Sequence, residues 1–600
     1  MASKDENFSA WYNDIIEDAE LIDKRYPVKG MDIWRPYGVK IRDLVDDVTH
    51  SEMERTGHDE YEFPLLIPQR EFQKEADHIE GFDAEVFWVT HGGTTELDEK
   101  LLLRPTSETA MYSMFAEWIR SDSDLPFKTY QIVNTFRYET QHTRSFIRVR
   151  EIHFFEAHTA HRDYEAAEDQ IVEDLEILEN VSDALCVPVT TCQRPEWDKF
   201  PGAHYTIAAD VLMPDMRTLQ IASVHHYKTN FSEPYEVDYI VDIDTWFEEQ
   251  AEASGLDPEA ITYDGKFNGP LDEGGGWTGF DVTYKDTTYR VPDVVSDEDA
   301  DLDNQSGPGA FDEVVQAPEG FAWEWPDRPG NHEGPPLAIE TEDGDLEIPF
   351  FSVNRHVHQT TYGMSERLIG SIVGVHGDDQ GLRLPPDVAP IQVVVVPVIF
   401  EEAEDEIREA CAAVADELDE SFRVRLDDRD KTAGFKYNHW EQRGVPLRIE
   451  IGPRDVDDDQ VVLVPRDGFE DEVDLASDHA TDAPEGRKLV VPREDLAEAV
   501  EEQLAAFKTR LRTDADALLE DNLQTVKTLE EAENQPGVLR TWWCGDDECA
   551  EEIETEGAKD VMGFPRTVED GEVVPAEETQ GACIACGTET DQVVYMGKAY

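Results

Sequence analysis

One stretch of the chain, residues 136–155, restricts the fold more than any other; it reads FRYETQHTRSFIRVREIHFF. Two apolar segments flank a polar turn, a pattern typical of a β-hairpin. The stretch holds four arginines, although the whole chain has only 51 basic residues against 135 acidic ones. We expect Arg137 and Arg148 to lie close together on one side of the hairpin, where two guanidinium groups suit phosphate or carboxylate oxygens. The stretch therefore predicts a bound anion.

The charge of the chain is extreme, with a formal net value of -84 over 600 residues. A disordered acidic protein is excluded because 40% of the residues are hydrophobic and 10% are aromatic. Concentrated salt would screen the self-repulsion, since the Debye length is only about 3 Å at 1 M. We therefore expect a folded protein of several domains from a halophilic cytoplasm.

No apolar run approaches the roughly 20 residues that a membrane helix needs, and the first residues lack the pattern of a secretory signal. A cytosolic, reducing location follows as an expectation. The last tenth of the chain contains C-x4-C and C-x2-C pairs separated by 33 residues, and a glycine adjoins each pair. This spacing suits a structural four-thiolate zinc site, with free buried cysteines as the alternative. The four residues are Cys544, Cys549, Cys583 and Cys586.

Apolar periodicity predicts helices followed by strands in the first half of the chain. A long helix that leads into a proline-bounded strand is compatible with a dimer interface, and equally with an ordinary core. The expected helices cover residues 8–26, 38–56 and 164–184, and the expected extended segments cover residues 62–68, 187–191, 204–213 and 218–224.

Two segments carry polar residues where a strand or helix ends. In RPTSE, Thr106 or Ser107 could cap a helix, while Glu108 near its amino end could instead await the ammonium or imino group of a ligand. In LQIASVHHY, strand alternation places Ser223 and His225 on one face and Gln220 on the other.

A further helix begins in GMSERLIG, where Ser365 is the expected cap and Arg367 lies in the first turn. A cation is unfavourable there because the helix dipole is positive at its amino end. Either the side chain points to solvent or a phosphate lies beside it; the second interpretation explains the position better.

Two regions differ from the rest in charge. Residues 246–345 hold 26 acidic and four basic residues together with many turn formers, which predicts an inserted subdomain. From residue 389 onward, strands and helices alternate as in a small α/β domain. Its window 421–466 balances nine basic with nine acidic residues, which indicates a polyanionic partner. A helix is expected over residues 433–442, and a long one over residues 494–533.

Taken together, these motifs resemble the prolyl-tRNA synthetases of the archaeal and eukaryotic type. The resemblance rests on RPTSE, FRYE…FIRVREIHFFEAH, QIASVHH, GMSERLIG…VHGDDQGLRLPP and GFKYNHWEQRGVPLRIEIGPRD, and it extends over nearly the whole chain except residues 246–345. It implies an α+β fold: a class II antiparallel sheet with flanking helices, an α/β anticodon-binding domain and a small zinc-containing carboxyl-terminal domain. The implied catalytic domain covers residues 1–245 and 346–388, with the acidic insertion over residues 246–345. The anticodon-binding domain covers residues 389–500, and the zinc-binding domain covers residues 501–600.

The resemblance also implies an activity and its substrates. Proline and ATP with Mg²⁺ would give prolyl-adenylate, and the prolyl group would pass to tRNA(Pro) in a homodimeric enzyme. Arg137 would neutralise the α-phosphate and the proline carboxylate, and Arg367 would bind the γ-phosphate. The other implied ATP contacts are Glu139, Arg148, Phe154, Gln220 and Ser223.

The same resemblance assigns the two recognition sites. Proline would contact Thr106, Glu108, Arg137 and His225. The anticodon would contact Phe435, Lys436, Glu441 and Arg448, although each could instead belong to an ordinary solvated surface. Tyr600 resembles a terminal tyrosine whose carboxylate reaches toward the active site.

Two rival functions stay open at this point: a class II synthetase for another amino acid, and a synthetase-like RNA-binding protein without catalysis. The second should lack Arg137, Glu139 or Arg367, all of which are present. Residues 246–345 lie where related bacterial enzymes carry an editing domain, but they show no likeness to it. A structural or salt-adaptive insertion is the expected role.

Overall fold

The computed structural model describes the chain with gaps. The residues described are 2–74, 86–138, 142–241, 249, 251–270, 276–292, 313–314, 337–341, 343–348, 354–400, 403–467, 481–482 and 488–600. The chain divides into two compact units, one of Met1–Met111, Lys128–Pro234 and Gln359–Tyr600, and one of Tyr112–Phe127 and Tyr235–His358. No helix in the described ranges has the length and apolar character that crossing a membrane requires.

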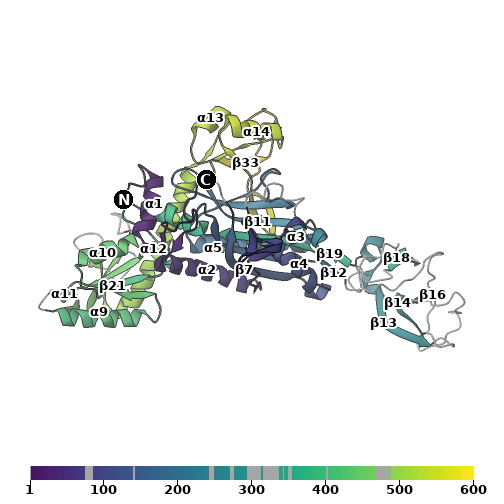
Figure 1. Cartoon of the computed structure of the whole chain (residues 1–600), viewed down its shortest axis with the longest axis horizontal. Helices are drawn as coiled ribbons and strands as arrows, with labels where there is room; N and C mark the ends of the chain where they lie inside the picture. Colours follow the sequence, from purple (N-terminus) through teal and green to yellow (C-terminus); the bar gives the residue numbers. More distant parts are fainter. Residues whose placement is uncertain are drawn as a thin grey trace. The chain divides into compact units, whose positions relative to one another are not determined.

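A twelve-stranded sheet organises the first unit (Figure 1). Its order is β27-β28-β33-β29-β9-β10-β11-β20-β8-β7-β3, with β30 paired to β29. The strands from β9 to β20 pair antiparallel, as expected for the catalytic sheet. Their bounds are β3 Asp59–Glu60, β7 Phe127–Phe136, β8 Glu151–His161, β9 Thr190–Gln193, β10 Tyr205–Leu212, β11 Thr218–Lys228, β20 His358–Ser365, β27 Leu523–Thr525, β28 Val538–Trp542, β29 Asp560–Glu569, β30 Glu572–Pro575 and β33 Val593–Gly597.

Four helices bury their apolar faces against this sheet in one hydrophobic core. Helix α5 contributes residues at helical spacing, Ile171, Leu175 and Leu178, while α8 buries nearly its whole length. The helices are α1 Phe8–Asp18, α2 Pro36–Arg55, α5 Tyr164–Ala184 and α8 Arg367–His376. The expectations for α2, α5 and α8 are therefore confirmed to within two residues.

Two helix predictions were too long. The first helix ends at Asp18 because Glu20 adopts φ +60° and Leu21 N–H donates to Ile16 O (3.1 Å), which closes the helix end. The segment expected as one helix over residues 494–533 forms α12 Leu496–Asp521, the edge strand β27 and α13 Leu529–Asn534. Thr528 caps α13 by accepting from the main-chain N–H of Glu531. The pairing of β27 with β28 outweighs the helical periodicity of the segment.

The smaller elements near the amino end of the first unit form two further sheets. One is β1-β2 and the other is β4-β6-β5. Their bounds are β1 Ile22–Asp23, β2 Ile33–Trp34, β4 Leu66–Pro68, α3 Gln69–Lys74, β5 Trp88–Gly92 and β6 Thr95–Leu103. Two helices, α4 Glu108–Trp118 and α6 Ser232–Tyr235, begin in the first unit and end in the second.

Residues from 389 onward form the expected α/β domain, drawn in green in Figure 1. Alternate residues of β21 face opposite sides: Val393 and Val395 pack toward α9, whereas Val394 and Val396 pack toward Trp440 of α10. The sheet order is β22-β21-β23-β24-β26-β25. Bounds are β21 Val393–Pro397, α9 Glu404–Leu418, β22 Val424–Leu426, α10 Ala433–Gln442, β23 Leu447–Ile451, α11 Pro453–Asp457, β24 Gln460–Pro465, β25 Thr481–Asp482 and β26 Leu489–Pro492. The proposed boundary at residue 500 falls inside α12.

The second unit contains the described part of the acidic segment. Its four-stranded sheet has the order β13-β14-β15-β16, and β12 pairs with β19 and β17 with β18. Bounds are β12 Asp238–Ile240, β13 Ile261–Pro270, β14 Gly276–Tyr284, β15 Thr287–Pro292, β16 Glu313–Val314, β17 Leu337–Glu340, β18 Asp345–Ile348 and β19 Asn354–His356. Much of the expected insertion over residues 246–345 lies outside the described residues.

Candidate functional site

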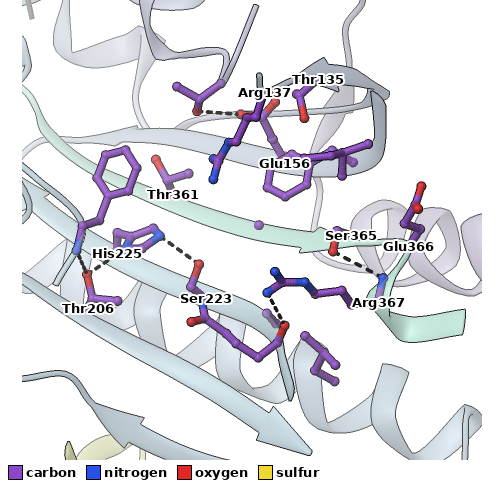
Figure 2. Close-up of a pocket in the computed structure, with 18 of the residues that line it drawn as sticks. Thr135, Arg137, Glu156, Thr206, Ser223, His225, Thr361, Ser365, Glu366 and Arg367 are labelled. Atoms are coloured by element: carbon purple, nitrogen blue, oxygen red, sulfur yellow. Dashed lines mark hydrogen bonds between the residues drawn. The ribbon is translucent and has the colours of Figure 1, made fainter. Parts of the chain in front are cut away.

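A cavity of about 420 Å³ opens on the main sheet of the first unit. Its walls come from the segment after β7, from β8, β11 and β20, and from the first residues of α4 and α8. Figure 2 shows Arg137 and Arg367 entering it from different sides, with His225 between the strands below Thr361. The candidate residues of the sequence that meet here are Thr106, Glu108, Arg137, Arg148, Phe154, Gln220, Ser223, His225 and Arg367. Glu139 lies outside the described residues.

The arginine-rich stretch forms a hairpin, but its key arginines do not lie on the strands. Strand β7 ends at Phe136 and β8 begins at Glu151, so Arg137 and Arg148 belong to the connecting segment. Arg137 N–H donates to Arg150 O (3.0 Å), which continues the pairing for one step. A tight turn then closes through a hydrogen bond from Arg148 N–H to Arg144 O (2.8 Å). Both predicted arginines line the cavity.

Arg367 is the first residue of α8 and is partly buried. The expected cap was wrong: Glu366 occupies the N-cap position of α8 without a side-chain cap bond, and Ser365 Oγ accepts only from the main-chain N–H of Arg367 (3.3 Å). Its guanidinium Nε donates to Ile147 O (2.9 Å), and Nη1 donates to Gln220 O (3.0 Å). These two carbonyls hold the side chain in the cavity wall (Figure 2). The interpretation in which Arg367 points to solvent is therefore wrong.

Burial and two neighbouring positive charges act against the charged form of Arg367. Burial and then the positive charges of Arg137 and Arg148 lower its pKa from 12.5 to about 10. Asp210 and Glu366 act in the opposite direction and offset this only in part. Three cations that repel one another across a cavity form a site that a polyanion would stabilise.

Gln220 reaches the same side of β11 as Ser223, against the strand alternation expected from the sequence. The register of β11 with β10 shifts: Ala222 is opposite Ala209, but Gln220 is opposite Asp210. Ile221 is thus an extra residue, and a β-bulge of this kind reverses which face the following side chains occupy. Gln220 and Ser223 consequently both line the cavity.

Glu108 begins α4 and is only 2% exposed. The hydroxyl of Thr106 donates to its carboxylate, and Tyr227 OH donates to its Oε1 (3.0 Å). Ser107 Oγ donates to a different carboxylate, Glu156 Oε1 (2.5 Å). Both candidate capping hydroxyls thus bind carboxylates, so simple capping does not account for them. The arrangement presents a carboxylate in the wall to a cationic ligand group.

His225 forms an uncharged part of the wall. Burial, followed by the charge of His158, lowers its pKa to about 3. Its Nδ1 shares a hydrogen bond with Thr206 Oγ1 (2.8 Å), its Nε2 shares one with Ser223 Oγ (3.0 Å), and its ring lies 4.9 Å from that of Phe200. His225 therefore offers shape and hydrogen bonding without charge near neutral pH.

Glu156 and Arg194 line the cavity but were missed in the sequence. Glu156 is 1% exposed. Burial raises its pKa, but His158, the Ser107 hydroxyl and the charge of Arg104 together hold the pKa below its usual value. It lies two residues beyond Phe154 on β8, so strand alternation could have found it. Arg194 carries no such signal, because its contacts with Gln220 and Met562 need strands that lie further along the chain.

The four carboxyl-terminal cysteines come together as expected. Their sulfurs lie within 4.8 Å of one another; Cys544 Sγ is 3.7 Å from Cys549 Sγ and 3.8 Å from Cys586 Sγ. Four zinc–thiolate bonds of about 2.3 Å in a tetrahedron separate the sulfurs by about 3.8 Å. Gly545 and Gly587 adopt φ +85° and +75° in the turns that bring each pair together. The donor set and its spacing fit zinc. The fourth cysteine, Cys583, is buried.

The four anticodon candidates lie on or beside α10, but they differ in exposure. Phe435 is 48% exposed and stacks near His439, with ring centroids 6.1 Å apart. Glu441 and Arg448 bind each other, Nη1 to Oε1, at 2.8 Å. Lys436 is 1% exposed, and its Nζ donates to Asp427 O (2.9 Å). Lys436 thus supports the domain from within instead of facing solvent.

Tyr600 lies beside the arginine segment. Arg148 Nη2 donates to the main-chain oxygen of Tyr600 (3.0 Å), and Tyr600 OH donates to Asp215 Oδ2 (2.9 Å). The guanidinium carbons of Arg144 and Arg217 lie 5.5 and 5.6 Å from its ring centroid. The last residue of the sequence therefore contacts an arginine of the cavity wall.

Comparison with known families matches three segments of the chain. Residues 87–246 match the class II tRNA synthetase core domain (G, H, P, S and T), residues 392–483 match an anticodon-binding domain, and residues 526–600 match the carboxyl-terminal domain of prolyl-tRNA synthetase.

Whole-chain relatives agree. The chain is 41% identical to a proline–tRNA ligase of Thermococcus kodakarensis over 99% of this chain and 98% of that protein, and 38% identical to one of Thermoplasma acidophilum over 99% of both. A solved Giardia lamblia prolyl-tRNA synthetase in complex with prolyl-adenylate superposes with a TM-score of 0.74 and 28% identity, covering 100% of this chain and 99% of that one. The chain belongs to the prolyl-tRNA synthetases, ligases of class II that form aminoacyl-tRNA.

Proposed function

We propose that the cavity in Figure 2 is where this proline–tRNA ligase joins L-proline to ATP, giving prolyl-adenylate and pyrophosphate. The observation that carries the proposal is the meeting of Arg137, Arg148 and Arg367 opposite the carboxylate of Glu108. An amino acid and a nucleoside triphosphate together present one cationic amine and several anionic oxygens. The three arginines complement the oxygens, and the carboxylate complements the amine.

The reaction requires positioning and charge neutralisation more than an acid or a base. A carboxylate oxygen of proline attacks the α-phosphorus of ATP, the new C–O–P bond forms, and the bond to pyrophosphate breaks. Because both reactants are anionic, positive groups on the cavity wall must hold them together. As in class II synthetases, ATP enters with Mg²⁺.

We assign the nucleotide contacts by combining the motifs with the geometry. Arg137 neutralises the α-phosphate and the proline carboxylate, and Arg367 binds the γ-phosphate. Arg148 binds the outer phosphates and exchanges its bond with Tyr600 for them. Glu139 accepts from the adenine amino group, Phe154 packs near the base, and Gln220 and Ser223 contact the nucleotide.

We assign the proline contacts to the opposite side of the cavity. Glu108 pairs with the secondary ammonium group of proline, supported by the hydroxyl of Thr106. The neutral ring of His225, packed on Phe200, encloses the pyrrolidine ring. One methylene distinguishes substrates by only about 1–3 kcal/mol, so this wall must supply shape as well as charge.

For the second step, the prolyl group passes to the 3′ end of tRNA(Pro), which the α/β domain recognises through its anticodon. Phe435 offers an exposed stacking surface, and the paired Glu441 and Arg448 offer an acceptor and donors for base edges. We give the buried Lys436 a supporting role at this surface.

We further propose a structural zinc ion on the four cysteines, because the sulfur spacing fits a tetrahedral site. The ion would fix the turns of the carboxyl-terminal domain and would take no part in the chemistry. Metal content should fall in Cys586→Ser, measured by atomic absorption on protein purified without added metal, while Cys411→Ser should leave it unchanged. Equal metal in both variants would argue against the site.

The remaining proposals concern the setting of the enzyme. The charge of -84 favours a halophilic cytoplasm, where activity would rise as KCl approaches molar concentrations. Leu65 and Leu66 are each 41% exposed, which favours a homodimer through this region. Light scattering of the purified protein in molar KCl would show a monomer mass if the dimer proposal is wrong.

The direct test of the function is ATP–pyrophosphate exchange with each amino acid separately, in molar KCl. Exchange should depend on L-proline. Exchange that depends on another amino acid would favour a different class II specificity, and the absence of any exchange would favour an RNA-binding protein without catalysis.

A further inference from the structure

Arg194 contacts three strands, β10, β11 and β29, at one wall of the cavity. It is 9% exposed and lines the cavity from the segment after β9. Its Nη2 donates to Asp210 Oδ2 (2.8 Å) and to Gln220 Oε1 (3.4 Å), and its Nη1 donates to Met562 O (2.6 Å). Its Nε lies 3.4 Å from Asp198 Oδ2. One planar guanidinium thus joins β10, β11 and β29.

The contact with β29 brings the carboxyl-terminal domain to this arginine. Strand β29 pairs with β9, Phe564 opposite Gln193 and Pro565 opposite Cys192. Gly563 has φ +117°, and a Cβ on it would lie 2.1 Å from Gln193 O. Glycine is therefore required for the close approach that places the carbonyl of Met562 on Arg194.

The contact with Gln220 fixes the direction of an amide. The main-chain oxygen of Gln220 accepts from Arg367, and its side-chain oxygen accepts from Arg194. A carboxamide has one accepting and one donating end, so an arginine on the oxygen turns the NH₂ group away from itself. The bulge opposite Asp210 has already placed this side chain at the cavity. The NH₂ group is then the end of the amide that is left for an oxygen acceptor in the cavity.

We propose that Arg194 is a positioning residue for adenylate formation: held by Asp210 and by the main chain of β29, it orients the Gln220 amide toward the nucleotide. This inference rests on the proposed role of Gln220 in ATP binding. A buried guanidinium also needs acceptors for its five N–H groups, so the positioning role is separated from a structural one by the kinetics of variants.

A double-mutant cycle in proline-dependent ATP–pyrophosphate exchange tests the inference. Arg194→Met and Gln220→Ala are each expected to raise the KM for ATP about tenfold, the effect of one buried polar contact, and to change the KM for proline less than about twofold. The double variant should equal Gln220→Ala alone, because Arg194 acts through that side chain. Arg566→Met is the matched control: Arg566 donates to Gln193 Oε1 (3.0 Å) at the same β9–β29 junction and should leave the KM for ATP unchanged.

The outcomes separate this inference from the proposed function. The positioning role would be overturned if the rise in the KM for ATP of the double variant were the product of the two single rises. Equal rises in the KM for ATP and the KM for proline in Arg194→Met would also overturn it. Neither result would contradict proline activation. A normal KM for ATP in Gln220→Ala would overturn both the role of Gln220 and the inference. If Arg194→Met does not fold, Arg194→Lys serves: it keeps the charge beside Asp210 but cannot reach both partners, and a wild-type KM for ATP in this variant would contradict the proposal.

Discussion

The repulsion among the cavity arginines predicts that removing one of them abolishes activity without weakening the empty enzyme. Arg367→Met is the informative change, because Arg367 is partly buried and faces Arg137 and Arg148. Methionine fills similar space without a charge. The variant relieves an electrostatic cost that the wild-type enzyme carries until ATP binds.

The magnitude follows from the pKa of Arg367. The shift from 12.5 to about 10 corresponds to at most about 3 kcal/mol against the charged form. The variant also loses the hydrogen bonds to Ile147 O and Gln220 O, each contributing about 1 kcal/mol. The two terms nearly cancel, so the unliganded variant should be as stable as the wild type or more stable by about 1 kcal/mol. Exchange activity should fall at least about a thousandfold, as for other arginines that bind a phosphoryl group in transfer.

Arg466→Met is the matched control for this prediction. The Arg466 side chain is 1% exposed, and its guanidinium binds both oxygens of Asp378 at 2.6 and 3.1 Å, away from the cavity. Its loss leaves a carboxylate unpaired, so this variant should melt at a lower temperature and keep a normal KM for ATP.

Two measurements test this prediction. The first is thermal unfolding without ATP in molar KCl, monitored by tryptophan fluorescence, and the second is pyrophosphate exchange. The reasoning would be refuted if Arg367→Met lowered the melting temperature as much as Arg466→Met does. It would also be refuted if Arg367→Met retained exchange.

Two further changes test separate parts of the molecule. Burial raises the pKa of Asp174 from 3.8 to about 8 in the folded protein. The stability that the protonated carboxyl group contributes is therefore fully present below about pH 4 and is lost as the pH rises through about 8. The free energy of unfolding of Asp174→Asn in urea should therefore equal that of the wild type near pH 4 and exceed it near pH 8. The same difference between the two proteins at both pH values would contradict this. Phe435→Ala removes the exposed stacking surface. The KM for tRNA should rise by the factor that corresponds to about 1–3 kcal/mol of lost stacking, while the exchange reaction stays unchanged. An unchanged KM for tRNA would exclude Phe435 from recognition.

Residues that belong to short local patterns could be predicted from the sequence. Glu108 follows directly on a strand-to-helix turn, and Arg367 violates the dipole rule at the start of α8. Each signal lies within a few residues, so periodicity and capping rules detect it. The structure brings these separate signals to one cavity.

Features that depend on pairing between distant segments could not be predicted. The bulge that turns Gln220 to the cavity arises from the register of β11 with β10. The role of Arg194 arises from a strand that follows more than three hundred residues later in the chain.

Arg137 gives the most direct test of the central claim, which is that the arginine cavity activates proline. Exchange and tRNA binding should be measured on the same preparation of Arg137→Ala in molar KCl. The account predicts that proline-dependent exchange is lost while the affinity for tRNA(Pro) stays close to that of the wild type. Normal exchange in this variant would contradict the account.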